Sequence, residues 1–150
     1  CQHRRVDEAL KAGGAAVGAK TVIETLPGMF PLACSPRLND LFVENIKEYF
    51  PETKIEDAGH FTASTDMGDI SHLMPSIHPF IGGVDGGLHT KDFCVTDFDA
   101  AAILPGKVFA MNIIDLLYDE AAMAKEILEK EKPILTKEEY LAKLESYFQS

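Results

Sequence analysis

Glycines and prolines gather in the middle of this chain, between two regions with helical patterning. Residues 62–91 combine them with hydroxyl side chains, aspartates and three of the five histidines. Glycine lets the backbone approach a ligand closely, and histidine and aspartate are residue types that bind metal ions. The stretch therefore predicts a wall of loops at a functional site, which the surrounding helices and short strands hold in place.

The composition allows one compact core and restricts the partners. Hydrophobic residues make up 46% of the 150, and 14 Lys plus Arg against 24 Asp plus Glu give a formal net charge of −10. This charge repels nucleic acid and anionic membrane surfaces. No uninterrupted apolar run approaches the roughly 20 residues that span a bilayer. We therefore expect neither nucleic acid nor a membrane as a partner.

The cysteines bear on the cellular compartment and on the start of the chain. Cys1, Cys34 and Cys94 are odd in number and lack CxxC spacing, so neither a disulfide framework nor a cysteine zinc site is indicated. A reducing cytoplasm fits this usage. The chain begins at Cys1 and enters helical patterning at once, which predicts a piece of a longer protein. A lipoprotein tethered through Cys1 is an alternative.

The helix with the clearest sequence signals is predicted at 36–50. Ser35 and Pro36 supply an N-cap and a first-turn proline. The apolar stripe that follows has helical spacing and consists of Leu38, Leu41, Phe42, Ile46 and Tyr49.

Three more helices are predicted. One covers 3–18, one runs from Pro105 to Lys130 with a new cap at Asp119, and one opens at Thr136, whose spacing to Glu139 is that of a capping box. The long helix should bury one face made of Val108, Met111, Ile114, Leu117 and Tyr118.

Short strands are predicted at 20–26, 60–64 and 76–81. Residues 27–32 contain two prolines and a glycine, which break both periodicities and indicate a domain junction. Helices interleaved with short strands predict a layered α/β fold.

Each polar residue of the loops has an ordinary structural interpretation beside a functional one. His89 is either a metal ligand or a turn histidine bonded to backbone. Asp66 either contacts the substrate or a metal ligand, or it caps a short helical turn. Asp69 is expected to be a capping or solvated carboxylate. His72 and His78 either bind a substrate carboxylate or are half-buried at strand ends.

Patterns for other chemistries are weak. Four glycines surround Asp85, namely Gly82, Gly83, Gly86 and Gly87. Their amides could face an anion, but no GxGxxG or Walker pattern is present. Ser64 and Ser71 lack a nucleophile elbow, and Cys94 has no basic neighbour to activate its thiol. Nucleotide binding and serine or cysteine hydrolysis are disfavoured, and a non-catalytic module that binds a small anion is the alternative function.

The chain resembles the C-terminal stretch of M20-type metallo-amidohydrolases. The residues that carry the resemblance are Ser64-Thr65-Asp66-Met67-Gly68-Asp69-Ile70-Ser71, Pro75, Ile77-His78-Pro79 and Leu88-His89-Thr90. The nearest branch is that of aminobenzoyl-glutamate hydrolases, N-acyl-amino-acid amidohydrolases and dipeptidases. The likeness covers nearly the whole chain, because Arg5-Val6 and Leu26-Pro27-Gly28 are similar to the end of that family's lid domain.

The resemblance implies a domain organisation and a set of site residues. Residues 1–30 match the last helix and strand of the lid, and 31–150 match the C-terminal half of an α/β zinc-peptidase-like catalytic domain. His89 matches the family's last metal-ligating histidine, and Asp66 matches the motif aspartate beside the substrate pocket. Four further residues are expected to contact the substrate or the side chains that bind the metal, namely Thr65, His78, Gly82 and Gly83.

The resemblance also implies what lies outside this chain. The complete site holds divalent metal, zinc or manganese, with two ions that polarise an amide carbonyl and activate a water for a glutamate base. The remaining ligands and that glutamate belong to an upstream segment, so the 150-residue piece alone should be inactive. The expected substrates are N-acyl amino acids, aminobenzoyl-glutamate or dipeptides, and two copies should pair through the lid domain.

Overall fold

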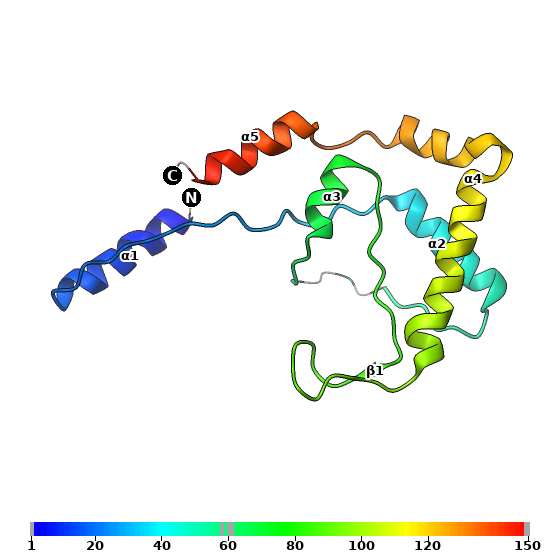
Figure 1. Cartoon of the computed structure of the whole chain (residues 1–150), viewed down its shortest axis with the longest axis horizontal. Coiled ribbons are helices and arrows are strands. Elements are labelled where there is room, and N and C mark those ends of the chain that lie inside the picture. Colours follow the sequence, from blue (N-terminus) through cyan, green and yellow to red (C-terminus); the bar gives the residue numbers. More distant parts are fainter. Residues whose placement is uncertain (1, 58, 60–61, 149–150) are drawn as a thin grey trace. The chain divides into compact units, whose positions relative to one another are not determined.

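The computed structural model describes residues 2–57, 59 and 62–148. The chain divides into a terminal unit, residues 1–28 with 138–150, and a central unit, Met29–Lys137. We describe each unit by itself. The order of elements, shown in Figure 1, is α1 (Gln2–Ala16), α2 (Pro36–Tyr49), α3 (Met67–Leu73), β1 (Val84–Asp85), β2 (Cys94–Val95), the π-helical turn η1 (Asp99–Ile103), α4 (Leu104–Lys130) and α5 (Lys137–Phe148).

In the terminal unit, α1 ends in a Schellman motif. The amide of Ala19 donates to the carbonyl of Gly14 at 2.9 Å, the amide of Gly18 donates to that of Ala15 at 3.1 Å, and Gly18 has φ +73°. The helix predicted at 3–18 is confirmed. The strand predicted at 20–26 is wrong, because these residues form no ladder and Thr21 instead folds back, its hydroxyl 3.5 Å from the Leu10 carbonyl.

In the central unit, α2 forms as its sequence signals predict. Ser35 Oγ accepts a hydrogen bond from the Leu38 amide at 3.1 Å, and Pro36 occupies the first turn. Leu41, Phe42 and Ile46 are buried. The stripe is shorter than predicted, because Tyr49 at the last turn is exposed.

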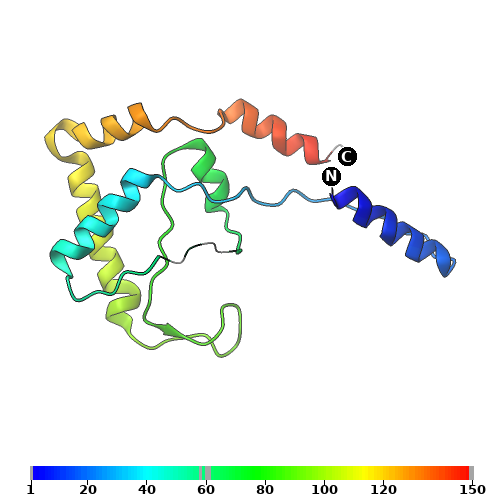
Figure 2. The same cartoon turned by 180° about the vertical axis from the view of Figure 1, so that it is seen from behind.

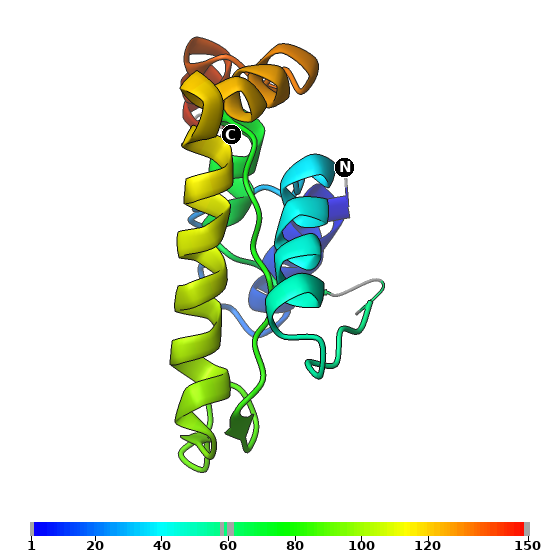
Figure 3. The ribbon, with the colours of Figure 1, turned by 90° about the vertical axis from the view of Figure 1, so that its right-hand side faces the viewer.

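Helices α2 and α4 lie side by side and enclose the core of the central unit (Figure 3). Phe42 and Ile46 pack with Val108, which is fully buried. The half-buried side chains of Phe50, Ile77, Ile81 and Leu104 surround this cluster. Ile77 and Ile81 therefore fix their segment against the helix pair, and the glycine-containing loops follow it in the sequence.

Helix α4 breaks where the sequence places a new cap. Residues 118–121 leave helical geometry, and Asp119, Glu120 and Ala121 have positive φ. The predicted buried face is only partly right: Val108 is buried, but Ile114, Leu117 and Tyr118 are exposed. The helix is apolar around most of its circumference, so periodicity alone does not identify the side that packs on α2.

The helical segment Asp99–Lys130 is long and apolar enough to cross a membrane by length and composition, with a mean hydropathy of 1.6 over an 18-residue window. The uninterrupted apolar runs within it are shorter than a membrane span, because Lys107 and Asp115 interrupt them without making the average polar. The core helix of a soluble protein meets the same criterion, so the finding is weak evidence for a membrane.

The sheet of the described residues is one short antiparallel hairpin, in which Val84 pairs with Val95 and Asp85 with Cys94. Residues 62–64 and 76–81 form no strand, so these predictions are wrong, while His60 and Phe61 lie outside the described residues. The layered α/β fold stays a prediction. Cys34 and Cys94 are free thiols.

Candidate functional site

A cavity of about 620 Å³ in the central unit brings separate loops together. Its wall consists of Pro31, Leu32, Gly59, Ala63, Ser64, Thr65, His78, Phe80, Leu88 and His89. Thr65, His78 and His89 were all predicted from the sequence as site residues. The volume lies in the range of roughly 300–1,000 Å³ that is typical of small-molecule sites. We take this cavity as the candidate functional site.

His89 lies on the loop of the β1–β2 hairpin. Both the amide and the hydroxyl of Thr90 donate to the carbonyl of Gly87, at 3.2 and 2.8 Å, and close a turn around His89. The backbone of His89 has φ +61° and its side chain is exposed at the cavity. A left-handed residue other than glycine costs about 1–2 kcal/mol, and such strain is concentrated at functional sites. His89 is therefore a turn residue that also reaches the cavity.

Two glycines shape this hairpin through close backbone approach. Gly83 has φ +84°, and a Cβ there would lie 2.5 Å from the Asp97 carbonyl oxygen. Gly86 also has φ +84°, and a Cβ there would lie 2.4 Å from the Asp92 carbonyl oxygen. The carbonyl of Gly83 accepts from the amides of Thr96 and Asp97 at 2.9 and 3.1 Å. Gly83 thus fixes the base of the hairpin and lies outside the cavity wall.

Two amides of the glycine loop are hydrogen-bonded within the loop itself. The Gly86 amide donates to the carboxylate of Asp85 at 2.8 Å, which places a negative charge at the loop. The Thr90 amide is bonded to Gly87 within the turn. This arrangement gives no support to the alternative of a small-anion module.

Thr65 and Asp66 lie at the start of α3. Thr65 Oγ1 donates to Asp66 Oδ1 at 3.2 Å and accepts from the Met67 amide at 3.4 Å. Asp66 is exposed, makes no side-chain capping bond, and is not part of the cavity wall. Its carboxylate is connected to the cavity through the hydroxyl of Thr65.

The polar residues of α3 hold the segment that forms the opposite part of the wall. Asp69 Oδ1 accepts from the Phe30 amide at 2.9 Å, and Ser71 Oγ accepts from the Ala33 amide at 2.9 Å. At Gly68, a Cβ would lie 1.8 Å from the Phe30 carbonyl oxygen, so only glycine fits. Figure 1 and Figure 2 show this segment passing beside α3. These contacts position Pro31 and Leu32 at the cavity.

The two histidines that the sequence leaves undecided have different surroundings. His72 Nδ1 lies 2.9 Å from the Gly68 carbonyl oxygen, and its ring packs on Phe30 with centroids 5.1 Å apart. His78 stacks on Phe80 with centroids 5.8 Å apart and an interplanar angle of 29°. His78 and Phe80 both line the cavity, whereas His72 does not. His72 therefore supports α3, and His78 is available to a ligand.

A metal ion would need more ligands than this chain brings together. Among residues 2–57, 59 and 62–148, no three His, Cys, Asp or Glu side chains gather where they could hold one. A zinc site takes about three protein ligands or more. The described residues alone do not fit a metal ion, and His89 can supply one ligand.

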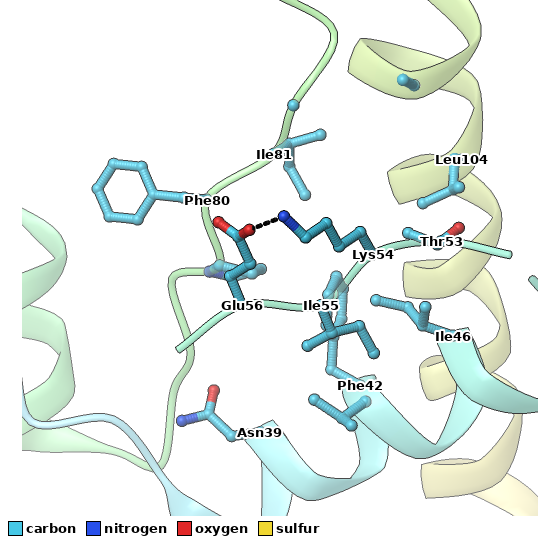
Figure 4. A pocket seen from close by; sticks show the side chains of 14 residues that line it. Asn39, Phe42, Ile46, Thr53, Lys54, Ile55, Glu56, Phe80, Ile81 and Leu104 are labelled. Carbon is cyan, nitrogen blue, oxygen red and sulfur yellow. Dashed lines mark ion pairs between the residues drawn. The ribbon is translucent and has the colours of Figure 1, made fainter. Parts of the chain in front are cut away.

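A second groove, of about 350 Å³, lies between α2, residues 53–56, residues 79–82 and the start of α4 (Figure 4). Phe42, Ile46, Ile55, Ile81 and Leu104 make it apolar, and Lys54 and Glu56 form an ion pair at its exposed edge. Gly82 lines this groove and not the cavity at His89. The lining residues that the structure describes include no histidine or cysteine, and we assign no chemistry to the groove.

Comparisons with known proteins give one distant relative. No family model matches the chain, and no solved structure matches it. The chain is 28% identical over 128 residues to the Xaa-Arg dipeptidase of Mus musculus. The match covers 80% of this chain and 30% of the mouse protein, so the chain spans about a third of that relative's length. The similarity supports a peptidase-like relationship.

Proposed function

We propose that this chain is the C-terminal part of a metal-dependent amidohydrolase of the M20 type. The observation that supports this most is the meeting of His89, His78 and Thr65 in one cavity of ligand size, in a chain similar to a dipeptidase. Residues 1–30 would end the lid domain and 31–150 would complete the catalytic domain. The substrates would be dipeptides, N-acyl amino acids or aminobenzoyl-glutamate, and the enzyme would be a cytoplasmic homodimer paired through its lid.

In this proposal His89 supplies one imidazole to a divalent ion, zinc or manganese, whose other ligands come from an upstream segment. The ion, when bound, polarises the amide carbonyl and lowers the pKa of a bound water. The turn at Gly87 and Thr90 holds His89 at the cavity. A fixed ligand direction matters because metal sites tolerate little error in geometry.

The rest of the wall would bind and orient the substrate. Phe80 holds the ring of His78 at the cavity, where it can hydrogen-bond a substrate carboxylate or carbonyl. The hydroxyl of Thr65 is fixed by Asp66 and by the Met67 amide. Leu32 and Leu88 offer apolar contact to a side chain. Since no carboxylate lines the described part of this cavity, the substrate panel should include neutral as well as arginine-bearing dipeptides.

The experiment uses the longer protein that the proposal requires. Bound zinc and manganese are measured by elemental analysis, and turnover is measured on a panel of dipeptides, N-acyl amino acids and aminobenzoyl-glutamate. His89→Gly removes the imidazole and suits the positive φ. We expect metal affinity to fall by about 100-fold or more, and turnover with it. The control is Lys91→Ala in the same loop, which should change neither.

Unchanged metal content in His89→Gly would remove the ligand assignment. A wild-type longer protein without metal or amide hydrolysis would contradict the proposed function. The 150-residue chain alone should hydrolyse none of these substrates, and activity of the purified chain would show that its site is complete without further ligands.

A further inference from the structure

Residues 118–121 interrupt α4 with a backbone conformation that their sequence does not require. Tyr118 is extended, with ψ 154°, and the next three residues have φ of +48°, +54° and +61°. Residues other than glycine adopt this left-handed conformation singly rather than in series, and each one lowers the population of such a state by roughly tenfold. The segment contains no glycine or proline, and a helix can restart from one extended cap residue without this cost. The break is therefore a strained segment.

Two contacts with α2, one on each side of the break, explain its position. Before it, Asp115 accepts from Nδ2 of Asn45 at 2.8 Å, and after it, Oε1 of Glu131 accepts from the Arg37 amide at 3.2 Å. Asn45 and Arg37 are eight residues apart, which is about 12 Å along α2. Asp115 and Glu131 are sixteen residues apart, and a straight helix of about 24 Å would carry Glu131 past the start of α2. The turn at 118–121, which Figure 2 shows, brings it back.

The residues that follow α4 lead on to α3. We call residues 131–135 the latch, because they contact both neighbouring helices. The carboxylate at the start of the latch bonds to the first turn of α2, and the amide of Leu135 donates to the carbonyl of His72 on α3 at 3.0 Å. Helix α3 in turn holds the segment of Leu32 at the cavity through the hydrogen bonds of its polar side chains. The latch therefore connects the break in α4 to the wall of the candidate site.

We infer that residues 118–121 are a hinge with two states, bent and straight, and that the latch holds it bent. In the straight state α4 is one continuous helix, and the latch has left α2 and α3. The backbone strain favours the straight state, whereas the bonds of the latch and the burial of Ile127, which is 4% exposed, favour the bent one. Because α3 loses a support in the straight state, the segment of Leu32 loosens and the cavity opens.

The hinge also gives the cavity a means of regulation. A ligand that touches Leu32 binds the bent state better, so its binding closes the latch. Closing of the latch strengthens the binding of the ligand to the same degree. This coupling holds for whatever the cavity binds, so failure of the proposed function would leave the hinge in place.

Substitution of Glu131 tests the latch in the 150-residue chain. Glu131→Ala removes the acceptor for the Arg37 amide, whereas Glu131→Gln keeps an oxygen in its place. Backbone chemical shifts report φ and ψ at residues 119–121. We expect Glu131→Ala to move these shifts to those of right-handed helix, and the unaltered Leu135 amide to exchange at least about tenfold faster. Glu131→Gln should resemble wild type in both. Left-handed shifts and unchanged exchange at Leu135 in Glu131→Ala would overturn the inference.

Substitutions in the hinge test it without touching the latch. Ala121→Gly relieves the strain of the bent state and should slow exchange at Leu135. Ala121→Val, whose branched side chain opposes a positive φ, should speed this exchange by about tenfold. The matched control is Ala122→Val, which places the same side chain in ordinary helix and should change exchange at Leu135 by less than about threefold. Equal effects of the two valines would contradict the hinge.

Two further amides in the same spectra show how far the release extends. The Val108 amide lies in the core and reports unfolding of the whole chain, so it should change less than Leu135 in Glu131→Ala and Ala121→Val. The Phe30 amide, which donates to Asp69, reports the cavity wall and should follow Leu135. Equal changes at Val108 and Leu135 would replace the hinge by global unfolding, and an unchanged Phe30 amide would disconnect the latch from the cavity; either result overturns the inference.

Discussion

Asn45 of α2 donates from Nδ2 to Oδ1 of Asn112 on α4 at 2.8 Å, and both side chains are only 5% exposed. The same Nδ2 donates to Asp115 Oδ2 at 2.8 Å. These polar groups lie beside the apolar cluster of Phe42, Ile46 and Val108. Because a buried amide without a partner is costly, the bonds favour one register of the two helices over others.

We expect Asn45→Ala to lower the free energy of unfolding by about 1–3 kcal/mol, since it leaves the Asn112 amide oxygen and the Asp115 carboxylate without this donor. Urea unfolding measures the change. The control is Asn39→Ala, an exposed position of α2, which should stay within about 0.5 kcal/mol of wild type. A double-mutant cycle between Asn45→Ala and Asn112→Ala that gives no coupling energy would contradict the role of this bond.

Replacement by alanine should affect stability differently at two buried serines, lowering it at one and leaving it unchanged or raising it at the other. Ser71 Oγ donates to the Gly68 carbonyl at 2.7 Å and accepts from the Ala33 amide, so Ser71→Ala should cost about 1–2 kcal/mol. Ser76 Oγ is buried and has no hydrogen-bond partner in the described part of the chain. Ser76→Ala should therefore be neutral or stabilise the protein by up to about 1 kcal/mol. Thermal unfolding of both variants decides, and equal losses would contradict these assignments.

The break in α4 provides a pair of neighbouring alanines with different backbones. Ala121 has φ +61°, a conformation that costs a side-chain-bearing residue about 1–2 kcal/mol. Ala121→Gly should therefore raise the free energy of unfolding. The gain should reach at most about 1 kcal/mol, because glycine also makes the unfolded chain more flexible and this offsets part of the relieved strain. The next residue, Ala122, lies in ordinary helix, and Ala122→Gly should lower the free energy of unfolding by about 1 kcal/mol. Chemical denaturation of the two variants tests the difference in sign.

One ion pair gives a pH dependence with a defined sign. Lys130 donates a hydrogen bond to the Glu126 carboxylate, which lowers the pKa of Glu126 below its ordinary 4.5 and raises the pKa of Lys130 above 10.5. The stabilisation from Glu126 is present above its unfolded-state pKa and is lost as pH falls through the lowered value. That from Lys130 is present below 10.5 and is lost as pH rises through the raised value.

The stability difference between wild type and Glu126→Gln should therefore be constant between about pH 5 and pH 10 and vanish in acid. It should also shrink in high salt, because both groups are exposed. Denaturant melts across this pH range measure it. Glu52→Gln, an exposed carboxyl outside the pair, is the matched control, and a difference that grows in acid would contradict the assignment.

Helices were predictable from this sequence because their signals are local. The bond from the Leu38 amide to Ser35, the proline after it and the buried Leu41 and Ile46 all follow from residues within a few positions of one another. The side on which α4 packs was not predictable, because that depends on contact with α2, a distant segment. The strands predicted at 20–26 and 76–81 failed for a related reason, since alternation permits a strand but only a pairing partner creates one.

The candidate site was predictable in part. The motif residues Thr65, His78 and His89 do line one cavity, although their chemical roles stay predictions. The contribution of Leu32 was missed, because it depends on hydrogen bonds to α3 such as that from the Phe30 amide to Asp69, 39 residues away. Gly82 and Gly83 were expected at the substrate. Gly82 instead lines the neighbouring groove, and Gly83 lies at the base of the hairpin.

The cavity wall draws on residues near 31, 64, 79 and 88, which are far apart along the chain. Bringing such distant segments together costs loop entropy that a single helix does not require. Helix α2 can begin to form from its own residues, but the pocket exists only after the segment at Phe30 has closed onto α3. We therefore expect the pocket to be among the last features to appear during refolding, and among the first to open under mild denaturation.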